Sequence, residues 1–67
     1  MADITASHSL RVQIEEVERE IRMRRGVYPR QVAKGKLRQG EADELIRRME
    51  SVLGTLRWAQ EHSTGAP

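Results

Sequence analysis

The amino-acid sequence predicts an all-α protein: an antiparallel two-helix hairpin with a short helix in the connecting corner, oligomerising into a helical bundle. Two long stretches carry apolar residues at helical spacing, Gly26 and Pro29 mark a break between them, and no segment has the alternation of a strand. At 67 residues without cysteine, the chain forms one small domain with a thin core. Self-association is therefore expected to complete that core.

The first predicted helix runs from residue 10 to residue 25. Its apolar residues are spaced by four, three and four positions, which places them on one stripe of the helix: Leu10, Ile14, Val17 and Ile21. Four polar side chains precede the stripe and are candidates for the N-cap: Asp3, Thr5, Ser7 and Ser9. Gly26 is expected to end this helix, because glycine is common just after the last helical residue.

A corner is predicted to follow Gly26. Tyr28 precedes a proline and is biased toward extended backbone. Pro29 suits the first position of a helix, where its missing N–H needs no partner. The sequence therefore predicts a short helix that begins at Pro29 and closes at Gly35.

The second long helix is predicted to begin near residues 39–41 and to end near Gln60. Its apolar residues fall on one broad face: Ala42, Leu45, Ile46, Met49, Val52, Leu53 and Leu56. Trp58 falls on the opposite side, and tryptophan is enriched at interface hot spots. The expected interface with further copies of the chain consists of Met49, Val52, Leu53, Leu56 and Trp58. Flexible ends, residues 1–8 and 62–67, are expected to flank the helical domain of residues 9–61.

The composition argues against several classes of function. Cysteine is absent, and the two histidines, His8 and His62, lie near the ends, where precise catalytic geometry is hard to hold. No uncharged stretch approaches the roughly 18 residues of a membrane span. We therefore expect a cytoplasmic, non-enzymatic protein with no metal site and no cofactor.

The strongest functional candidate is the basic block of residues 22–38, which holds seven of the twelve basic residues and no acid. Arginine suits bidentate phosphate contacts, and a tyrosine ring can stack on a base. The candidate ligand-binding residues are Arg24, Arg25, Tyr28, Arg30, Lys34 and Lys36. Two interpretations stay open. Either the block binds an anionic ligand, in a pocket that oligomerisation completes, or its bases pair with acids of the flanking helices and keep the turn soluble.

The chain also resembles a group of small helical proteins encoded by bacteriophages and prophages. The likeness covers about residues 14–57 and rests on R-R-G-V-Y-P-R-Q-V-A-K-G-K-L and A-D-E-L-I-R-R-M-E-S-V-L-G-T-L. Members share a V-Y-P-x-x-V-x-x-G-K corner and an A-D-x-x-I-x-x-M helix. In that group a Ser or Thr often follows G-K-L, whereas here Arg38 does, so a regular N-cap is not expected at this position.

The resemblance implies stoichiometric binding in place of catalysis. Small phage accessory proteins block a host protein or sequester a defence signal such as a cyclic oligonucleotide. The leading hypothesis is sequestration of an anionic nucleotide signal in counter-defence. The alternatives are a module that inhibits a host protein through the apolar face of the second helix, and a nucleic-acid-binding protein. An extended nucleic acid fits the compact corner less well than a small nucleotide does.

Overall fold

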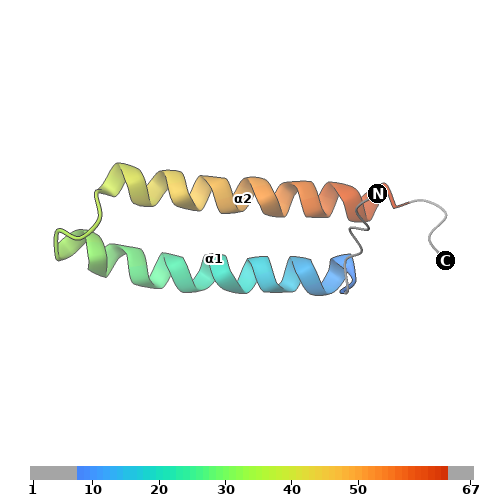
Figure 1. Ribbon diagram of the computed structural model, residues 1–67, viewed down its shortest axis with the longest axis horizontal. Coiled ribbons are helices and arrows are strands. Elements are labelled where there is room, and N and C mark those ends of the chain that lie inside the picture. The colour runs from blue at the N-terminus through green and yellow to red at the C-terminus, as the bar shows by residue number, and fades with distance from the viewer. Residues whose placement is uncertain (1–7, 64–67) are drawn as a thin grey trace, which may run out of the picture.

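The computed structural model describes residues 8–63, and these form two long helices that lie side by side (Figure 1). Helix α1 spans Leu10–Ala33 and helix α2 spans Gln39–Glu61. The chain reverses direction between them, so the helices run antiparallel. The predicted all-α helical hairpin is confirmed. In the described part of the chain, neither helix is long and apolar enough to cross a membrane.

Helix α1 begins at a serine cap. The Oγ of Ser9 accepts a hydrogen bond of 3.2 Å from the backbone N–H of Val12, which satisfies one of the unpaired donors at the helix start. Ser9 was one of four predicted candidates; the other three, Asp3, Thr5 and Ser7, lie outside the described residues. The predicted flexible ends likewise lie outside them, apart from His8, His62 and Ser63.

The prediction that the first helix ends at Gly26 is wrong, and so is the separate short helix beginning at Pro29. Helix α1 continues through both residues to Ala33. Ile14, Ile21 and Tyr28 recur every seven residues, so the buried stripe extends beyond the glycine and reaches the proline. Packing of this longer stripe against α2 offsets the hydrogen bond that Pro29 cannot donate to the carbonyl of Arg25.

Helix α1 ends in a Schellman motif at Gly35. Among the described residues, Gly35 is the one with a positive φ, of 73°. The N–H of Gly35 donates to the carbonyl of Val32 at 3.0 Å, and the N–H of Lys36 donates to the carbonyl of Gln31 at 2.9 Å. These two bonds satisfy carbonyls that the end of the helix leaves unpaired. The reversal therefore occupies residues 34–38, about eight residues later than the sequence predicted.

This assignment of the helix end can be tested with two glycine substitutions. Gly35→Ala should lower the free energy of unfolding by about 1 kcal/mol, because alanine is strained at a positive φ. Gly26→Ala should raise it by about 0.5–1 kcal/mol, because Gly26 lies within a helix and an added Cβ meets no atom within 4 Å. Urea denaturation of both variants gives the comparison. Opposite signs would restore Gly26 as the end of the helix.

Helix α2 starts close to where it was predicted, without a side-chain cap from Arg38. An arginine side chain has no acceptor atom, so it cannot cap the free N–H groups of the first turn. Glu41 supports the start instead, because its Oε1 accepts a hydrogen bond of 3.2 Å from the backbone N–H of Arg38. The carboxylate also lies in the first turn of α2, where the helix dipole favours a negative charge.

The core between the helices is thin. Among the described residues, three side chains are less than a tenth exposed: Ile14 at 8%, Ile21 at 7% and Ala42 at 3%. The other apolar residues predicted to face the core are half-buried, apart from Val52, which is 46% exposed. Two ion pairs join the helices: Glu18 with Arg57, at 2.6 Å, and Arg25 with Glu50.

Candidate functional site

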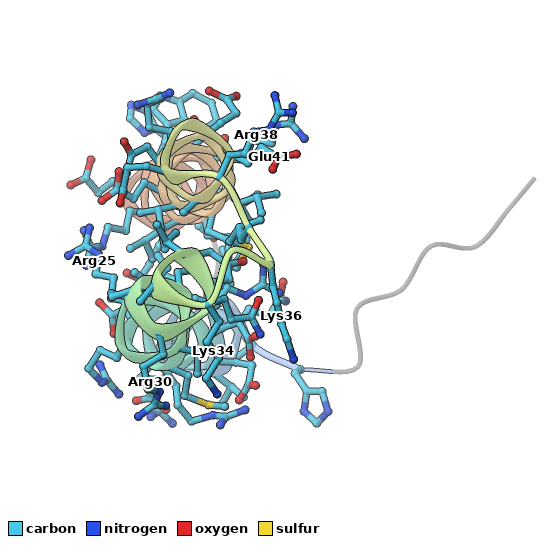
Figure 2. The ribbon with its side chains drawn as sticks, turned by 90° about the vertical axis from the view of Figure 1, so that its left-hand side faces the viewer. Arg25, Arg30, Lys34, Lys36, Arg38 and Glu41 are labelled. Carbon is cyan, nitrogen blue, oxygen red and sulfur yellow. The ribbon has the colours of Figure 1, made fainter. Side chains whose placement is uncertain are left out.

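The predicted ligand-binding residues lie along the last part of α1 and in the turn, and they do not gather into one pocket. Figure 2 views the hairpin from its turn end. Arg25 lies on one side of this end, and Lys36 lies on the opposite side. Arg30 projects from the side of α1 that faces away from α2, and Lys34 lies between Arg30 and Lys36. The charges therefore spread around the end of the hairpin, and each must be considered with its own neighbours.

Arg24 and Tyr28 are brought together, but their polar groups already have partners within α1. The Nε of Arg24 donates to Glu20 at 2.9 Å, and its guanidinium also donates to the hydroxyl of Tyr28 at 3.3 Å. The hydrogen bond to Glu20, followed by the one to Tyr28, raises the pKa of Arg24. Both side chains are half-buried. In this structure, the hydrogen bonds of these two side chains stabilise α1 itself.

Arg25 is also neutralised, by a residue far away in the sequence. Its guanidinium pairs with the carboxylate of Glu50 on α2. This pair lines a groove of about 350 Å³, which Tyr28 also lines. Its charged lining is balanced between two bases, Arg25 and Arg47, and two acids, Asp43 and Glu50. A groove with balanced charge does not by itself favour an anion, so Tyr28 and its neighbours do not form the predicted basic pocket within a single chain.

The bases at the turn differ from most other bases of the chain in having no ion-pair partner. We call Arg30, Lys34, Lys36 and Arg38 the turn-end basic cluster. None of the four forms an ion pair within residues 8–63, and all four are exposed. In contrast, seven arginines elsewhere each pair with a glutamate: Arg11, Arg19, Arg24, Arg25, Arg47, Arg48 and Arg57.

The two interpretations of the basic block therefore apply to different residues. Arg24 and Arg25 pair with acids of the helices, as the solubilising interpretation expected. The turn-end basic cluster keeps its charge available. Arg38 belongs to this cluster but was missing from the predicted site.

A signal in the sequence accounts for part of this difference. A base on a helix finds an acid most easily three or four residues away. Arg30 and Lys34 have no acid at any such position. Glu41 lies three residues after Arg38, but its carboxylate accepts from the backbone of that residue. The same criterion also selects Lys36 and Arg25, and Arg25 differs from the cluster only through its partner Glu50 on the other helix.

A second surface lies nearer the open end of the hairpin. It is a largely apolar groove of about 580 Å³, which we call the side groove, and its lining comprises His8, Val12, Gln13, Glu16, Val17, Val52 and Leu56. Of the predicted interface residues, Val52 and Leu56 line this groove. Met49 and Leu53 are half-buried on the face of α2 that was predicted to pack against the core.

Trp58 lies apart from the side groove on the outer part of α2. Its side chain is 60% exposed and stacks on the ring of His62, with centroids 4.3 Å apart and an interplanar angle of 17°. The Nδ1 of His62 lies 2.8 Å from the carbonyl oxygen of Trp58, which holds the two rings together at the helix end. The predicted interface residues therefore belong to three different environments.

The site chemistry within the described residues is that of a charged surface. No group of three or more His, Asp or Glu side chains gathers there as a metal ion would require. Comparisons of the chain with protein-family models, with curated proteins and with solved structures gave no match.

Proposed function

We propose that this protein is a non-enzymatic binding protein that takes up a phosphate-bearing ligand of nucleotide size at the turn-end basic cluster. The observation that carries the proposal is the absence of ion-pair partners for these four bases in the described part of the chain. A ligand anion can contact them without breaking an existing pair. At Arg24 or Arg25, the same contact would have to compete with a glutamate.

The composition of the cluster suits phosphate. Arg30 and Arg38 each offer a planar guanidinium that can donate two parallel hydrogen bonds to phosphate oxygens. Lys34 and Lys36 supply compact charges on flexible stems, which can follow a ligand of irregular shape. All four lie within nine residues of the sequence, but they spread around the end of the hairpin from Arg30 on α1 to Arg38 at the start of α2, so a small ligand would contact neighbouring members such as Lys34 and Lys36 (Figure 2). This short stretch matches a small ligand better than a long duplex.

The resemblance to bacteriophage proteins gives this binding a biological setting. A small protein that holds one nucleotide per site can lower the free concentration of a signalling nucleotide without any catalysis. In a phage this would act as counter-defence in the cytoplasm of the host cell. This part of the proposal depends on the resemblance in residues 14–57, whereas the anion site depends on the geometry of the turn.

A second candidate function is inhibition of a host protein through α2. Trp58 favours it, because a tryptophan that is 60% exposed is an unusual feature of a helix with solvent on its outer face. The host partner would then be captured through Trp58 independently of the turn. Capture that survives Trp58→Ala but is lost on charge reversal at Lys36 would count against this surface.

Ligand binding at the turn can be tested by neutralising one base. Lys36→Gln should weaken binding of a nucleotide by about tenfold, the equivalent of about 1.4 kcal/mol for one charge-assisted contact. Isothermal titration against a panel of mononucleotides and cyclic dinucleotides identifies the ligand, with inorganic phosphate as a further probe. No heat from any of these would refute the anion site.

The matched control is Arg22→Gln. Arg22 is exposed and, like Lys36, has no ion pair within the described residues, but it lies outside the turn. Both variants lose one positive charge, so equal weakening would indicate a general charge effect and no localised site. An oligonucleotide probe tests the nucleic-acid alternative. Its signature is an affinity that grows with the length of the oligonucleotide and falls steeply with salt.

A further inference from the structure

The two sides of the hairpin are built differently. Each of the two ion pairs between the helices uses one residue of α2: Glu50 in the first pair and Arg57 in the second. Counting about 100° per residue, these two residues lie on one side of the line along which α2 faces α1. Val52 and Leu56, which line the side groove, lie on the other side of that line. The ion pairs between the helices therefore lie on one side of the hairpin, and the apolar side groove lies on the other.

The half of α2 beside the side groove is also poor in charge. Residues 51–60 contain one charged residue, Arg57. It forms an ion pair with Glu18 on the side of the hairpin opposite to the side groove. The first half of the same helix, residues 39–50, contains six charged residues: Glu41, Asp43, Glu44, Arg47, Arg48 and Glu50. A solvated surface in a chain that is 33% charged would normally continue that pattern. Such an interruption is typical of a surface that a partner covers.

The charge of this surface also restricts the partner. The lining of the side groove holds one carboxylate, Glu16, which is already paired with Arg19, so a strongly acidic or basic protein would find few charges to recognise here. Two copies of the same nearly neutral surface can meet without repulsion, and each would bring apolar residues to the contact. A second copy also supplies what the hairpin lacks, because three side chains in the described residues are less than a tenth exposed. Two hairpins packed on this side form a four-helix bundle with a shared core.

We infer that a second copy of this chain docks on the side groove, related to the first by a twofold axis perpendicular to the helices. The turn-end basic cluster determines the orientation. If both turns pointed the same way, eight unpaired positive charges would meet at one end of the dimer. With the perpendicular axis, the two side grooves face each other, and the two turn-end basic clusters lie at opposite ends of the dimer. Each end then holds a complete cluster from one chain.

The surface is tested by a charge placed in the groove. Val52 is 46% exposed, so Val52→Glu should leave the hairpin folded while putting a carboxylate on the proposed contact. The matched control is Met23→Glu, because Met23 is 49% exposed and lies on the face of α1 that turns away from α2. In sedimentation equilibrium we expect a dimer for the wild type and for Met23→Glu, and a dissociation constant at least about 100-fold higher for Val52→Glu.

The orientation is tested by distances between spin labels. The chain has no native cysteine, so single variants Val52→Cys and Gln31→Cys label one position per copy. Gln31 lies five full turns along α1 from Gln13, on the same side of the helix but near the turn. At 1.5 Å per residue, it lies about 24 Å from the level of the groove, so the two Gln31 labels should be about 48 Å apart. The ion pairs of Arg25 with Glu50 and of Glu18 with Arg57 place Val52 about level with residue 23 of α1, eight residues or about 12 Å closer to the axis than Gln31. The two Val52 labels should therefore be about 24 Å apart, half the distance between the Gln31 labels.

Each other outcome overturns the proposal. A wild-type monomer at about 100 μM excludes the dimer and leaves the side groove to a different protein. A dimer that tolerates Val52→Glu but not Met23→Glu places the interface on the outer face of α1. Two Gln31 labels within about 20 Å would show that the turns lie together. The dimer does not depend on the anion site, so nucleotide binding by Val52→Glu is expected to match the wild type per chain.

Discussion

Replacing Ile21 with alanine should lower the free energy of unfolding by about 2–5 kcal/mol, the range for truncation of a buried isoleucine. Ile21 is 7% exposed and lies midway along α1 in the stripe that contacts α2. A domain of this size has a total stability of only about 3–10 kcal/mol, so the loss is a large part of it. Urea denaturation followed by circular dichroism, at one fixed chain concentration, measures the effect.

Met23→Ala is the control for this truncation. Met23 is two residues from Ile21 in the same helix, but it is 49% exposed. We expect its truncation to change the free energy of unfolding by less than about 0.5 kcal/mol, as is usual for surface positions. If the two variants lost the same stability, the face of α1 that packs in the protein would not be the one that the apolar stripe defines.

The fold was predictable from the sequence because its main signals are repeated. The stripe of Leu10, Ile14, Val17 and Ile21 defines one face of α1 at four positions, so no single residue decides the assignment. The apolar face of α2 has even more members. Ser9 and Glu41 then mark the two helix starts with side chains whose hydrogen bonds are local. Because these signals are local and repeated, the folded chain has the helices that they predict.

The turn was not predictable in the same way, because local signals conflict there. Gly26 and Pro29 both indicate a break when only their neighbours are considered. What decides between them and Gly35 is packing against α2, a helix that begins ten residues after Pro29. The recurrence of Tyr28 seven residues after Ile21 was the one clue that the buried stripe continued.

The candidate site was predicted as a region but not as a set of residues. The basic block of residues 22–38 is obvious from composition, yet the charge of each base depends on its partner. Glu50, which neutralises Arg25, is 25 residues away in the sequence and belongs to the other helix. Such a pairing depends on the register of the two helices, which a helical pattern alone does not define. Arg30 and Lys34 likewise have no acid three or four residues away, so the sequence alone does not separate them from Arg25.

Pro29→Ala should raise the free energy of unfolding by about 1–3 kcal/mol. In the structure Pro29 lies inside α1, where it cannot donate a hydrogen bond to the carbonyl of Arg25 and its ring crowds that carbonyl. Alanine restores the bond and has the highest helix propensity. Urea denaturation is again the measurement. Arg30→Ala is the control, because it changes an exposed residue of the same turn and should shift the stability by less than about 0.5 kcal/mol.

The sign of the Pro29 result distinguishes the two descriptions of the corner. If Pro29 began a separate short helix, its fixed φ would be favourable there, and alanine would lose about 0.4–1 kcal/mol by freeing the unfolded chain. If α1 is continuous, the same substitution gains stability. A gain would also bear on the anion site, since Arg30 and Lys34 are positioned by the last turn of α1. Pro29→Ala should then bind the nucleotide at least as tightly as the wild type, because the helix that presents these two bases becomes more stable.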